Sequence, residues 1–554
     1  MAKDTHKQSP HWVDQVVNEI FDWQKAEKIE KLHVDDMKTP SGRVHTGALR
    51  GVMIHDIVAK VIQSKSTSTV TSTYVFNDFD SMDGLPKYLD QEEYSQHMGK
   101  PLFQIPTPDL EESGVDFSKA SEEEKRRFKN ARSFAEFYAL DFIEAFRKLG
   151  CTQEILWSHE LYQSGQMDGI IRITLDNVDK FRKIYKEVAD YVLPEKWYPF
   201  QPVCERCGKV GTTLTTGWNG EKISYECQPN KVEWAQGCGH KGQVSPFGGT
   251  GKLLWKVDWP AHWNVMGVNV EGAGKDHTSA GGSRDMADAI CREVFDQVVP
   301  FDIPYEWILL RGSKMSSSKG VGTSAREFVE LFPAEVGRFL FVSRNYYQVI
   351  DFDPSTMAIP DLFDEYDAAA KVFWGMMGED QRLARSFELA QIGEMPPAHF
   401  LPRFRDVALW MQHPEIVLEE KFAEVKGSAL TELEKEVLSE RQRYAEVWVK
   451  RYAPEEFQLR AKETLPEAAK ELSTEQVEYL SQVITLIDSR ESWEPQDLQQ
   501  ELFELAKATV GPKPAFQAIY KAFLGKTAGP RAAWFLLSID KGLRLSRIQE
   551  LKAV

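Results

Sequence analysis

The sequence predicts an α/β fold with a parallel sheet, followed by an all-α C-terminal half. Before about residue 325, short strand-like runs alternate with stretches of helical apolar periodicity. Beyond that point almost every segment reads as helix, and proline or glycine residues separate the segments. A chain of 554 residues is too long for one hydrophobic core, so several domains are expected.

The opening unit has the order helix, strand, glycine turn, helix. Apolar residues between positions 11 and 30 fit one helical face, and residues 31–34 read as a short strand. The turn at 40–42 follows, and apolar residues recur at helical spacing from 49 to 61. A strand, a glycine turn and a helix in this order begin a doubly wound parallel sheet of the Rossmann type.

Further strand-like runs are expected to complete this sheet, and one region interrupts them. Between about residues 195 and 250, glycine, lysine and cysteine replace the apolar periodicity, which predicts a small inserted module. The sheet is therefore expected to be split around an insertion. The further runs lie at 72–76, 154–157, 253–259, 265–270 and 307–310.

These changes in composition also set the expected domain boundaries. Residues 1–175 and 251–325 are expected to form the two halves of the Rossmann domain. Residues 176–250 form the inserted connective region between them. Two helical regions follow, at 326–390 and 391–554.

The inserted region contains four of the six cysteines of the chain. So few cysteines in so long a chain do not make a disulfide framework, and their clustering indicates a metal in a reducing compartment. The spacing predicts a tetrahedral zinc knuckle, in which a fully ligated ion is structural. Five candidates compete for four positions, so Cys227 and His240 are alternatives. The candidate ligands are Cys204, Cys207, Cys227, Cys238 and His240.

A run of serines between two lysines suits a mobile phosphate clamp. Its ammonium and hydroxyl groups can follow a triphosphate as charge moves onto the departing pyrophosphate. We therefore expect Lys314 and Lys319 to act in the reaction and the residues between them to bind the nucleotide. The run reads Lys314-Met315-Ser316-Ser317-Ser318-Lys319-Gly320.

A matching segment lies near the N-terminus, where a glycine turn precedes a helix. Gly42 and Gly47 let the backbone approach an anion at the start of that helix. His45 and Thr46 are placed to hydrogen-bond phosphate oxygens. The segment reads Pro40-Ser41-Gly42-Arg43-Val44-His45-Thr46-Gly47, and Pro40 and Ser41 are assigned to the same nucleotide site.

Together these segments resemble the two signatures of class I aminoacyl-tRNA synthetases. The run from His45 to Ala48 is similar to His-Ile-Gly-His, and the run from Lys314 to Ser318 is similar to Lys-Met-Ser-Lys-Ser. Ala48 replaces the second histidine, and Ser317 replaces the second lysine. Lys319 can supply the missing charge.

The chain also resembles the class I lysyl-tRNA synthetase family, through Gly274-Lys275-Asp276-His277 and Tyr305-Glu306-Trp307. The resemblance covers the whole chain and is strongest from about 31 to 325. It implies a cytoplasmic enzyme that activates L-lysine with ATP and Mg²⁺ and transfers it to tRNA(Lys). It further implies that residues 326–390 contact the tRNA stem and that residues 391–554 bind the anticodon.

The expected specificity depends on Asp35, ten residues before His45. Glutamyl-tRNA synthetases, which are similar here, place at this position an arginine that reads the carboxylate of the substrate. A carboxylate instead favours a cationic side chain such as that of lysine. The alternative, a carboxylate that only ends a strand or a turn, stays open.

A lysine pocket also needs an apolar wall for the methylene stem and polar partners for both ends. We expect these from Thr39, Trp255, His277 and Tyr305, since each lies at a predicted strand end or in a motif loop. Core packing is a nearly equal alternative for the aromatic residues. Asp276, in an open glycine-rich stretch, is expected to accept from the ribose hydroxyls of ATP.

The composition limits the kinds of partner that the protein is expected to bind. A net charge of −17 argues against a surface coated for polyanions, and no run of 18 apolar residues or apolar leader is present. A soluble protein with no membrane partner is therefore expected, and a monomer is favoured. A locally basic segment can still bind tRNA, because residues 513–554 hold eight basic residues against two acidic ones. A solvated helix face is the alternative for that segment.

Two other functions stay open. One is a class I synthetase for another amino acid such as glutamate, against which Asp35 speaks. The other is a synthetase-like protein that binds tRNA without catalysis. Such a protein would not need two phosphate-contacting segments together with a ribose-binding carboxylate.

Overall fold

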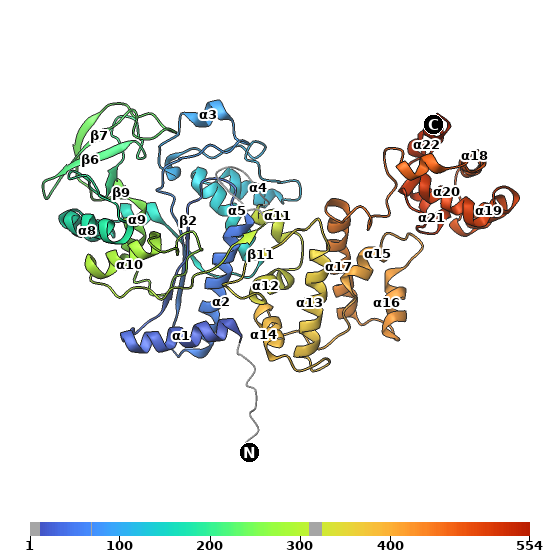
Figure 1. Cartoon of the computed structure of the whole chain (residues 1–554), viewed down its shortest axis with the longest axis horizontal. Coiled ribbons are helices and arrows are strands. Elements are labelled where there is room, and N and C mark those ends of the chain that lie inside the picture. Colours follow the sequence, from blue (N-terminus) through green and yellow to red (C-terminus); the bar gives the residue numbers. More distant parts are fainter. Residues whose placement is uncertain (1–10, 68, 310–323, 554) are drawn as a thin grey trace, which may run out of the picture. The chain divides into compact units, whose positions relative to one another are not determined.

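The computed structural model describes residues 11–67, 69–309 and 324–553 (Figure 1). The chain divides into two compact units. The first contains Met1–Asp353 and Ala369–Met395, and the second contains Pro354–Ala368 and Pro396–Val554. In the part of the chain that the structure describes, no helix is both long and apolar enough to cross a membrane.

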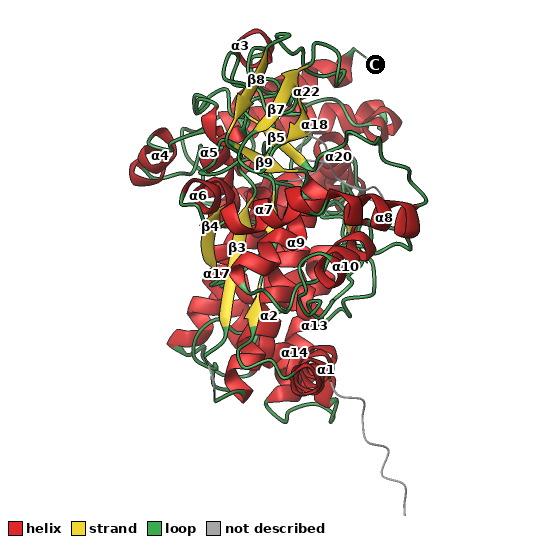
Figure 2. Cartoon of the chain, turned by 90° about the vertical axis from the view of Figure 1, so that its left-hand side faces the viewer, coloured by secondary structure: helices red, strands yellow, loops and turns green. Residues whose placement is uncertain are grey.

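A parallel sheet organises the first unit. Strand β3 (Thr71–Phe76) pairs on one side with β1 (His33–Val34) and β2 (Met37–Lys38), which follow each other along the same edge. On its other side β3 pairs with β4 (Glu154–Trp157), and Figure 2 shows these two strands side by side. All three pairings are parallel, as the sequence predicted.

Single parallel bridges extend the sheet beyond its first strand. Val34 pairs with Val270, Val270 pairs with Phe301, and Gly274 pairs with Tyr305. Numbered along the chain, the strands therefore stand in the order 3-2-1-4-5, which is the doubly wound order. The predicted Rossmann-type sheet is confirmed.

Helices make the crossovers between these strands. Helix α2 (Leu49–Lys65) connects the first strand to β3, and α10 (Ser283–Glu293) connects the fourth strand to the fifth. Because parallel crossovers are right-handed, the reversal of strand order puts these two helices on opposite faces of the sheet. Helix α1 (Trp12–Glu27) packs on α2, and α5 (Phe134–Lys148) leads into β4.

The predicted strand at 253–259 is wrong. Only β9 (Gly251–Leu253) is extended, and Trp255–Met266 forms helix α9. Trp255, Trp259 and Trp263 recur every fourth residue, and their rings contact one another along one helical face. A short apolar run does not by itself distinguish a buried strand from a buried helix. The expected strand at 265–270 is likewise reduced to the bridges made by Val270.

The inserted module consists of short antiparallel strands. β6, β7 and β8 form a three-stranded sheet, and β5 pairs with β9. Three helices precede the module. The bounds are β5 Phe200–Pro202, β6 Thr213–Trp218, β7 Ile223–Cys227, β8 Lys241–Val244, α6 Ser158–Gln163, α7 Asp168–Asp176 and α8 Val178–Ala189.

Short helices and strands lie between β3 and α5 and after the last parallel strand. They are α3 Gln91–Ser95, α4 Glu122–Lys129, β10 Ile308–Leu309, β11 Ile350–Asp351, α11 Ala325–Val329, α12 Ala334–Val342 and α14 Gln381–Ala390. β10 and β11 pair in parallel. The expected run at 307–310 is thus extended at Ile308–Leu309, and residue 310 lies outside the described residues.

The second unit is helical, which confirms the predicted all-α C-terminal half. Its last helices surround a core that includes Tyr479, Leu498 and Phe523. Helix α13 (Ala358–Phe373) has residues in both units. The other helices of this unit are α15 Phe404–Trp410, α16 Leu418–Lys426, α17 Glu432–Arg451, α18 Thr474–Asp488, α19 Pro495–Ala508, α20 Pro512–Leu524, α21 Ala532–Ser538 and α22 Lys541–Lys552.

Candidate active site

A cavity of about 370 Å³ lies where the first, fourth and fifth parallel strands end and where α2 and α9 begin. Doubly wound sheets bind ligands at such carboxyl ends, next to the reversal of strand order. The lining residues are Asp36, Met37, Lys38, Thr39, His45, Gly47, Ala48, Arg50, Tyr74, Asn77, Trp255, Trp259, Glu271, Gly272, Ala273, Gly274, Asp276, His277, Tyr305, Glu306, Trp307 and Ile308.

Many of the residues singled out in the sequence come together here. The lining contains Thr39, Trp255, His277 and Tyr305, which were expected to bind lysine, as well as His45, Gly47 and Asp276. Asp35, Pro40, Ser41, Gly42 and Thr46 do not line the cavity. Lys314, Met315, Ser316, Ser317, Ser318 and Lys319 lie outside the described residues.

The segment around His45 is attached to the chain that follows the serine run. His45 and Ser324 form an antiparallel bridge, and the Ala325 amide donates to the Val44 carbonyl at 2.9 Å. The Thr46 hydroxyl donates to the Ser324 carbonyl at 3.3 Å. These bonds hold residue 324 beside the edge of the cavity.

Side-chain contacts also connect the His45 segment to the start of α11. The Arg43 guanidinium forms an ion pair with Glu327 at 2.8 Å, and Glu327 completes a capping box with Ser324 at the start of α11. Gly42 has a φ of 141°, a region that favours glycine. A Cβ at Gly47 would lie 2.7 Å from His45 Nδ1, so any other residue at this position would displace the His45 ring.

The neighbouring residues Asp35 and Asp36 lie in different surroundings. Asp35 is fully buried and accepts a hydrogen bond from the Thr73 hydroxyl, whereas Asp36 lines the cavity. Asp36 Oδ1 accepts from the Met37 amide at 2.9 Å, and its side chain is 10% exposed. The structure therefore places Asp36, rather than Asp35, at the cavity.

A further carboxylate, Glu271, was missed in the sequence. It lines the cavity and accepts hydrogen bonds from the indoles of Trp259, at 2.9 Å, and Trp263. Burial and the nearby Asp35 raise the pKa of Glu271 to about 8. Its place just after the apolar run ending at Val270, where a parallel strand would stop, was the signal that could have found it.

An aromatic wall stands near these carboxylates. Trp255 and Trp259 stack with ring centroids 6.0 Å apart, and His277 lies 5.4 Å from Trp255. The two tryptophans come from the first turns of α9, one helical turn apart. This wall can cover a methylene stem.

A buried network orients Thr39 from behind the cavity. Its hydroxyl donates to Asp80 at 2.5 Å, and Asp80 is ion-paired with Lys252 of β9. Lys252 is also 3.0 Å from Asp258, which accepts from the Tyr162 hydroxyl. Burial alone would raise the pKa of Asp258, but Lys252 holds it well below its usual range. Strand β9, which pairs with β5 of the inserted module, thus contributes a cation that positions a cavity residue.

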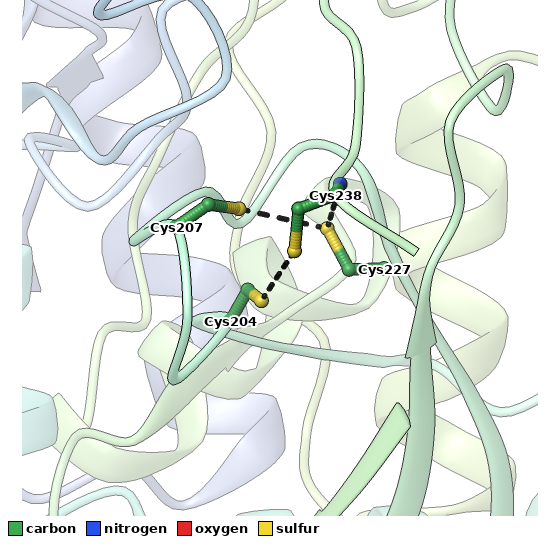
Figure 3. Close-up of side chains that lie close together, drawn as sticks. All are labelled: Cys204, Cys207, Cys227 and Cys238. Atoms are coloured by element: carbon green, nitrogen blue, oxygen red, sulfur yellow. Dashed lines mark hydrogen bonds between the residues drawn. The ribbon is translucent and has the colours of Figure 1, made fainter. Parts of the chain in front are cut away.

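The four cysteines of the inserted module form one cluster (Figure 3). Their sulfur atoms all lie within 4.8 Å of one another, with Cys204 and Cys238 3.6 Å apart and Cys207 and Cys227 3.7 Å apart. Sulfurs at the corners of a zinc tetrahedron stand about 3.8 Å apart for Zn–S bonds of about 2.3 Å. The donor set therefore fits a zinc ion.

His240 is not part of the cluster, and its Nε2 lies 3.8 Å from Glu205. Cys227 supplies the fourth sulfur instead. Gly208 and Gly239, with φ of 71° and 73°, make the two turns beside the cysteines.

Not all basic side chains of residues 513–554 are exposed to bind a polyanion, although the composition allowed it. Arg547 is fully buried and donates to the carbonyls of Ala522 and Lys462, and Arg544 donates to the Leu536 carbonyl. These two guanidiniums hold the helices together. Lys513, Arg531, Lys541 and Lys552 remain exposed.

Comparison with known proteins identifies the family. A family model described as tRNA synthetases class I (K) matches residues 10–393. The lysine–tRNA ligase of Methanosarcina barkeri is 32% identical over 565 residues, covering 98% of this chain and 97% of that protein. The lysine–tRNA ligase of Methanosphaera stadtmanae is 28% identical over 562 residues, covering 98% and 99%.

Among solved structures, a glutamate tRNA ligase from Elizabethkingia meningosepticum, in complex with its amino acid, covers 95% of this chain and 100% of its own. It has 12% sequence identity and a TM-score of 0.39. The family model spans well over half of the chain, including the cavity, the His45 segment and the cysteine cluster. This chain belongs to the family of class I tRNA synthetases designated K.

Proposed function

We propose that this protein is a lysine–tRNA ligase. It activates L-lysine with ATP to give lysyl-adenylate and diphosphate, and then transfers the lysyl group to the 3′ end of tRNA(Lys) with release of AMP. The observation that carries the proposal is the cavity itself, which combines carboxylates and an aromatic wall beside the His45 segment. Family membership and the two full-length relatives support it.

Activation is an attack by the lysine carboxylate on the α-phosphorus of ATP. The protein contributes positioning and charge stabilisation rather than covalent chemistry. His45, at the edge of the cavity, donates to phosphate oxygens, and Asp276 accepts from the ribose. Lys314 and Lys319 clamp the departing diphosphate. Mg²⁺, when bound with ATP, neutralises phosphate charge.

The lysine substrate occupies the rest of the cavity. Trp255 and His277 cover its methylene stem, while Thr39 and Tyr305 supply hydroxyl groups. The Asp80 carboxylate keeps the Thr39 hydroxyl in one orientation. We assign Thr39 a positioning role toward the substrate on this basis.

The cysteine cluster holds a structural zinc ion. Four thiolates complete its coordination and leave no position for a substrate, so the ion stabilises the inserted module. We also assign residues 326–390 to contact with the tRNA stem and residues 391–554 to the anticodon, acting as a monomer in the cytoplasm. The exposed lysines and arginine of the last helices support the second assignment.

ATP–diphosphate exchange with each proteinogenic amino acid, with and without total tRNA, tests the proposal. We expect exchange with lysine alone, and only when tRNA is present. Exchange with glutamate would overturn the specificity, and tRNA binding without any exchange would favour a non-catalytic protein.

A further inference from the structure

We infer that Asp36 and Glu271 together bind the side-chain ammonium of the amino-acid substrate, and that they, rather than Asp35, set its specificity. This inference rests on the proposed lysine–tRNA ligase function. Asp35 is defined by its distance along the chain from His45, whereas Asp36 and Glu271 are defined by their place in the cavity lining.

Strand geometry separates the two aspartates. The Asp35 amide donates to the Val270 carbonyl, and the Asp36 carbonyl accepts from the Val75 amide, so both residues are held between neighbouring strands. Successive side chains of a strand point to opposite faces. Asp35 therefore enters the interior, where it meets Thr73, and Asp36 reaches the cavity.

His55 approaches Asp36 but does not neutralise it. Its Nδ1 donates to the Gly51 carbonyl at 2.7 Å and lies 3.6 Å from Asp36 Oδ2. Its Nε2 accepts from the Gly272 amide at 2.7 Å. Burial lowers the pKa of His55, and Asp36 together with the Gly51 carbonyl raises it overall. The Gly272 amide nevertheless requires an unprotonated Nε2, which fixes the neutral tautomer.

Glu271 is held in place by neutral donors only. The indoles of Trp259 and Trp263 each donate to one of its oxygens, which fixes the carboxylate at the cavity wall without cancelling its charge. The guanidinium of Arg284 donates to the Glu271 main-chain carbonyl and pairs with Asp288 and Asp302.

Neither Asp36 nor Glu271 is ion-paired with a lysine or an arginine in the part of the chain that the structure describes. Lys38 and Arg50 line the same cavity, but no ion pair among the residues described joins either of them to these two carboxylates. A ligand that brings positive charge next to both carboxylates is therefore favourable. The aromatic wall beside them suits an alkyl chain that carries such a charge.

A divalent metal fits less well than an ammonium group. The cysteine cluster is the one group of three or more metal-ligating side chains found close enough to share an ion within the described ranges. A Cβ at Gly51 would lie 2.6 Å from Tyr305 Oη and 2.8 Å from Asp36 Oδ2, so a hydroxyl stands beside the carboxylate. A hydroxyl and two carboxylates are good acceptors for the three donors of an ammonium group.

Competition in lysine-dependent ATP–diphosphate exchange, with tRNA present, tests the inference. Norleucine keeps the α-ammonium of lysine and lacks the side-chain ammonium, whereas 6-aminohexanoate keeps only the latter. We expect Asp36→Asn and Glu271→Gln each to raise the KM for lysine about tenfold or more. Inhibition by 6-aminohexanoate should weaken in parallel, and inhibition by norleucine and the KM for ATP should not change.

Weaker inhibition by norleucine in these variants would overturn the inference, because the carboxylates would then bind the α-ammonium. Asp35→Asn is the matched comparison and should keep the preference for lysine over norleucine. Loss of that preference in Asp35→Asn alone would also overturn it. If Asp35→Asn does not fold, the other two variants decide. No lysine exchange in the unaltered protein would instead refute the proposed function.

Discussion

The hydroxyl of Thr39 donates a hydrogen bond of 2.5 Å to the carboxylate of Asp80. Asp80 is in turn ion-paired with Lys252, which is buried and comes from β9 beside the inserted module. A residue at the substrate cavity is therefore held by a cation from a part of the chain that carries no catalytic signature.

Replacing Lys252 by methionine should both destabilise the protein and weaken lysine binding. Removing the lysine leaves the buried Asp258 and the partly buried Asp80 without their cation, which costs about 3–5 kcal/mol. We expect a lower melting temperature and a higher KM for lysine, with the KM for ATP unchanged. Lys252→Arg keeps the charge and should recover part of both. Equal increases in both KM values would contradict a positioning role.

The cysteine cluster predicts which substitutions release the metal. Cys227→Ser should abolish stoichiometric zinc and lower the melting temperature, because one thiolate of the tetrahedron is lost. His240→Ala should retain zinc, since its ring lies outside the cluster. Metal analysis of the purified variants by atomic absorption checks both. Zinc loss in His240→Ala would assign the fourth ligand to the histidine.

The lysines of the serine run should act on chemistry rather than on tRNA affinity. Changing Lys314 and Lys319 together to alanine removes charges expected to stabilise the departing diphosphate. Losing such a group typically slows a reaction about 100- to 1,000-fold. We expect that loss in ATP–diphosphate exchange with tRNA present and little change in tRNA binding by filter assay. Unchanged exchange would refute the clamp.

Lysine binding should strengthen as the pH rises toward 8. Burial and Asp35 raise the pKa of Glu271 to about 8, and burial raises that of Asp35 to about 7. A raised carboxyl pKa contributes stability that is lost as the pH increases through it, so the ligand-free protein weakens between about pH 5 and 8. A bound ammonium offsets this by favouring the ionised carboxylates.

The test is the rise in melting temperature caused by lysine, compared at pH 6 and pH 8. We expect the larger rise at pH 8. In Glu271→Gln, which leaves the neighbouring Asp36 and His55 in place, the rise should depend less on pH. A larger rise at pH 6 would have the wrong sign for a cation bound to these carboxylates.

Local signals in the sequence were sufficient for several features. The glycine turn before α2, the cysteine spacing and the alternation of strand and helix each depend on residues close together in the chain. Such patterns predicted the doubly wound sheet, the inserted module and seven of the 22 lining residues of the cavity. They failed at 253–259, where an apolar run fits either a strand or a helix, and only packing on the neighbouring helix selected α9.

The sequence by itself placed Asp35 and Asp36 next to each other, directly after the strand expected at 31–34. It could not determine which of them faces substrate, since both faces of a doubly wound sheet are covered by helices. Only the tertiary structure decided this, by bringing Glu271 and the tryptophans of α9 to the side of Asp36. Only the tertiary structure likewise decided the role of Arg547. Its guanidinium donates to backbone carbonyls that come together only when the helices pack.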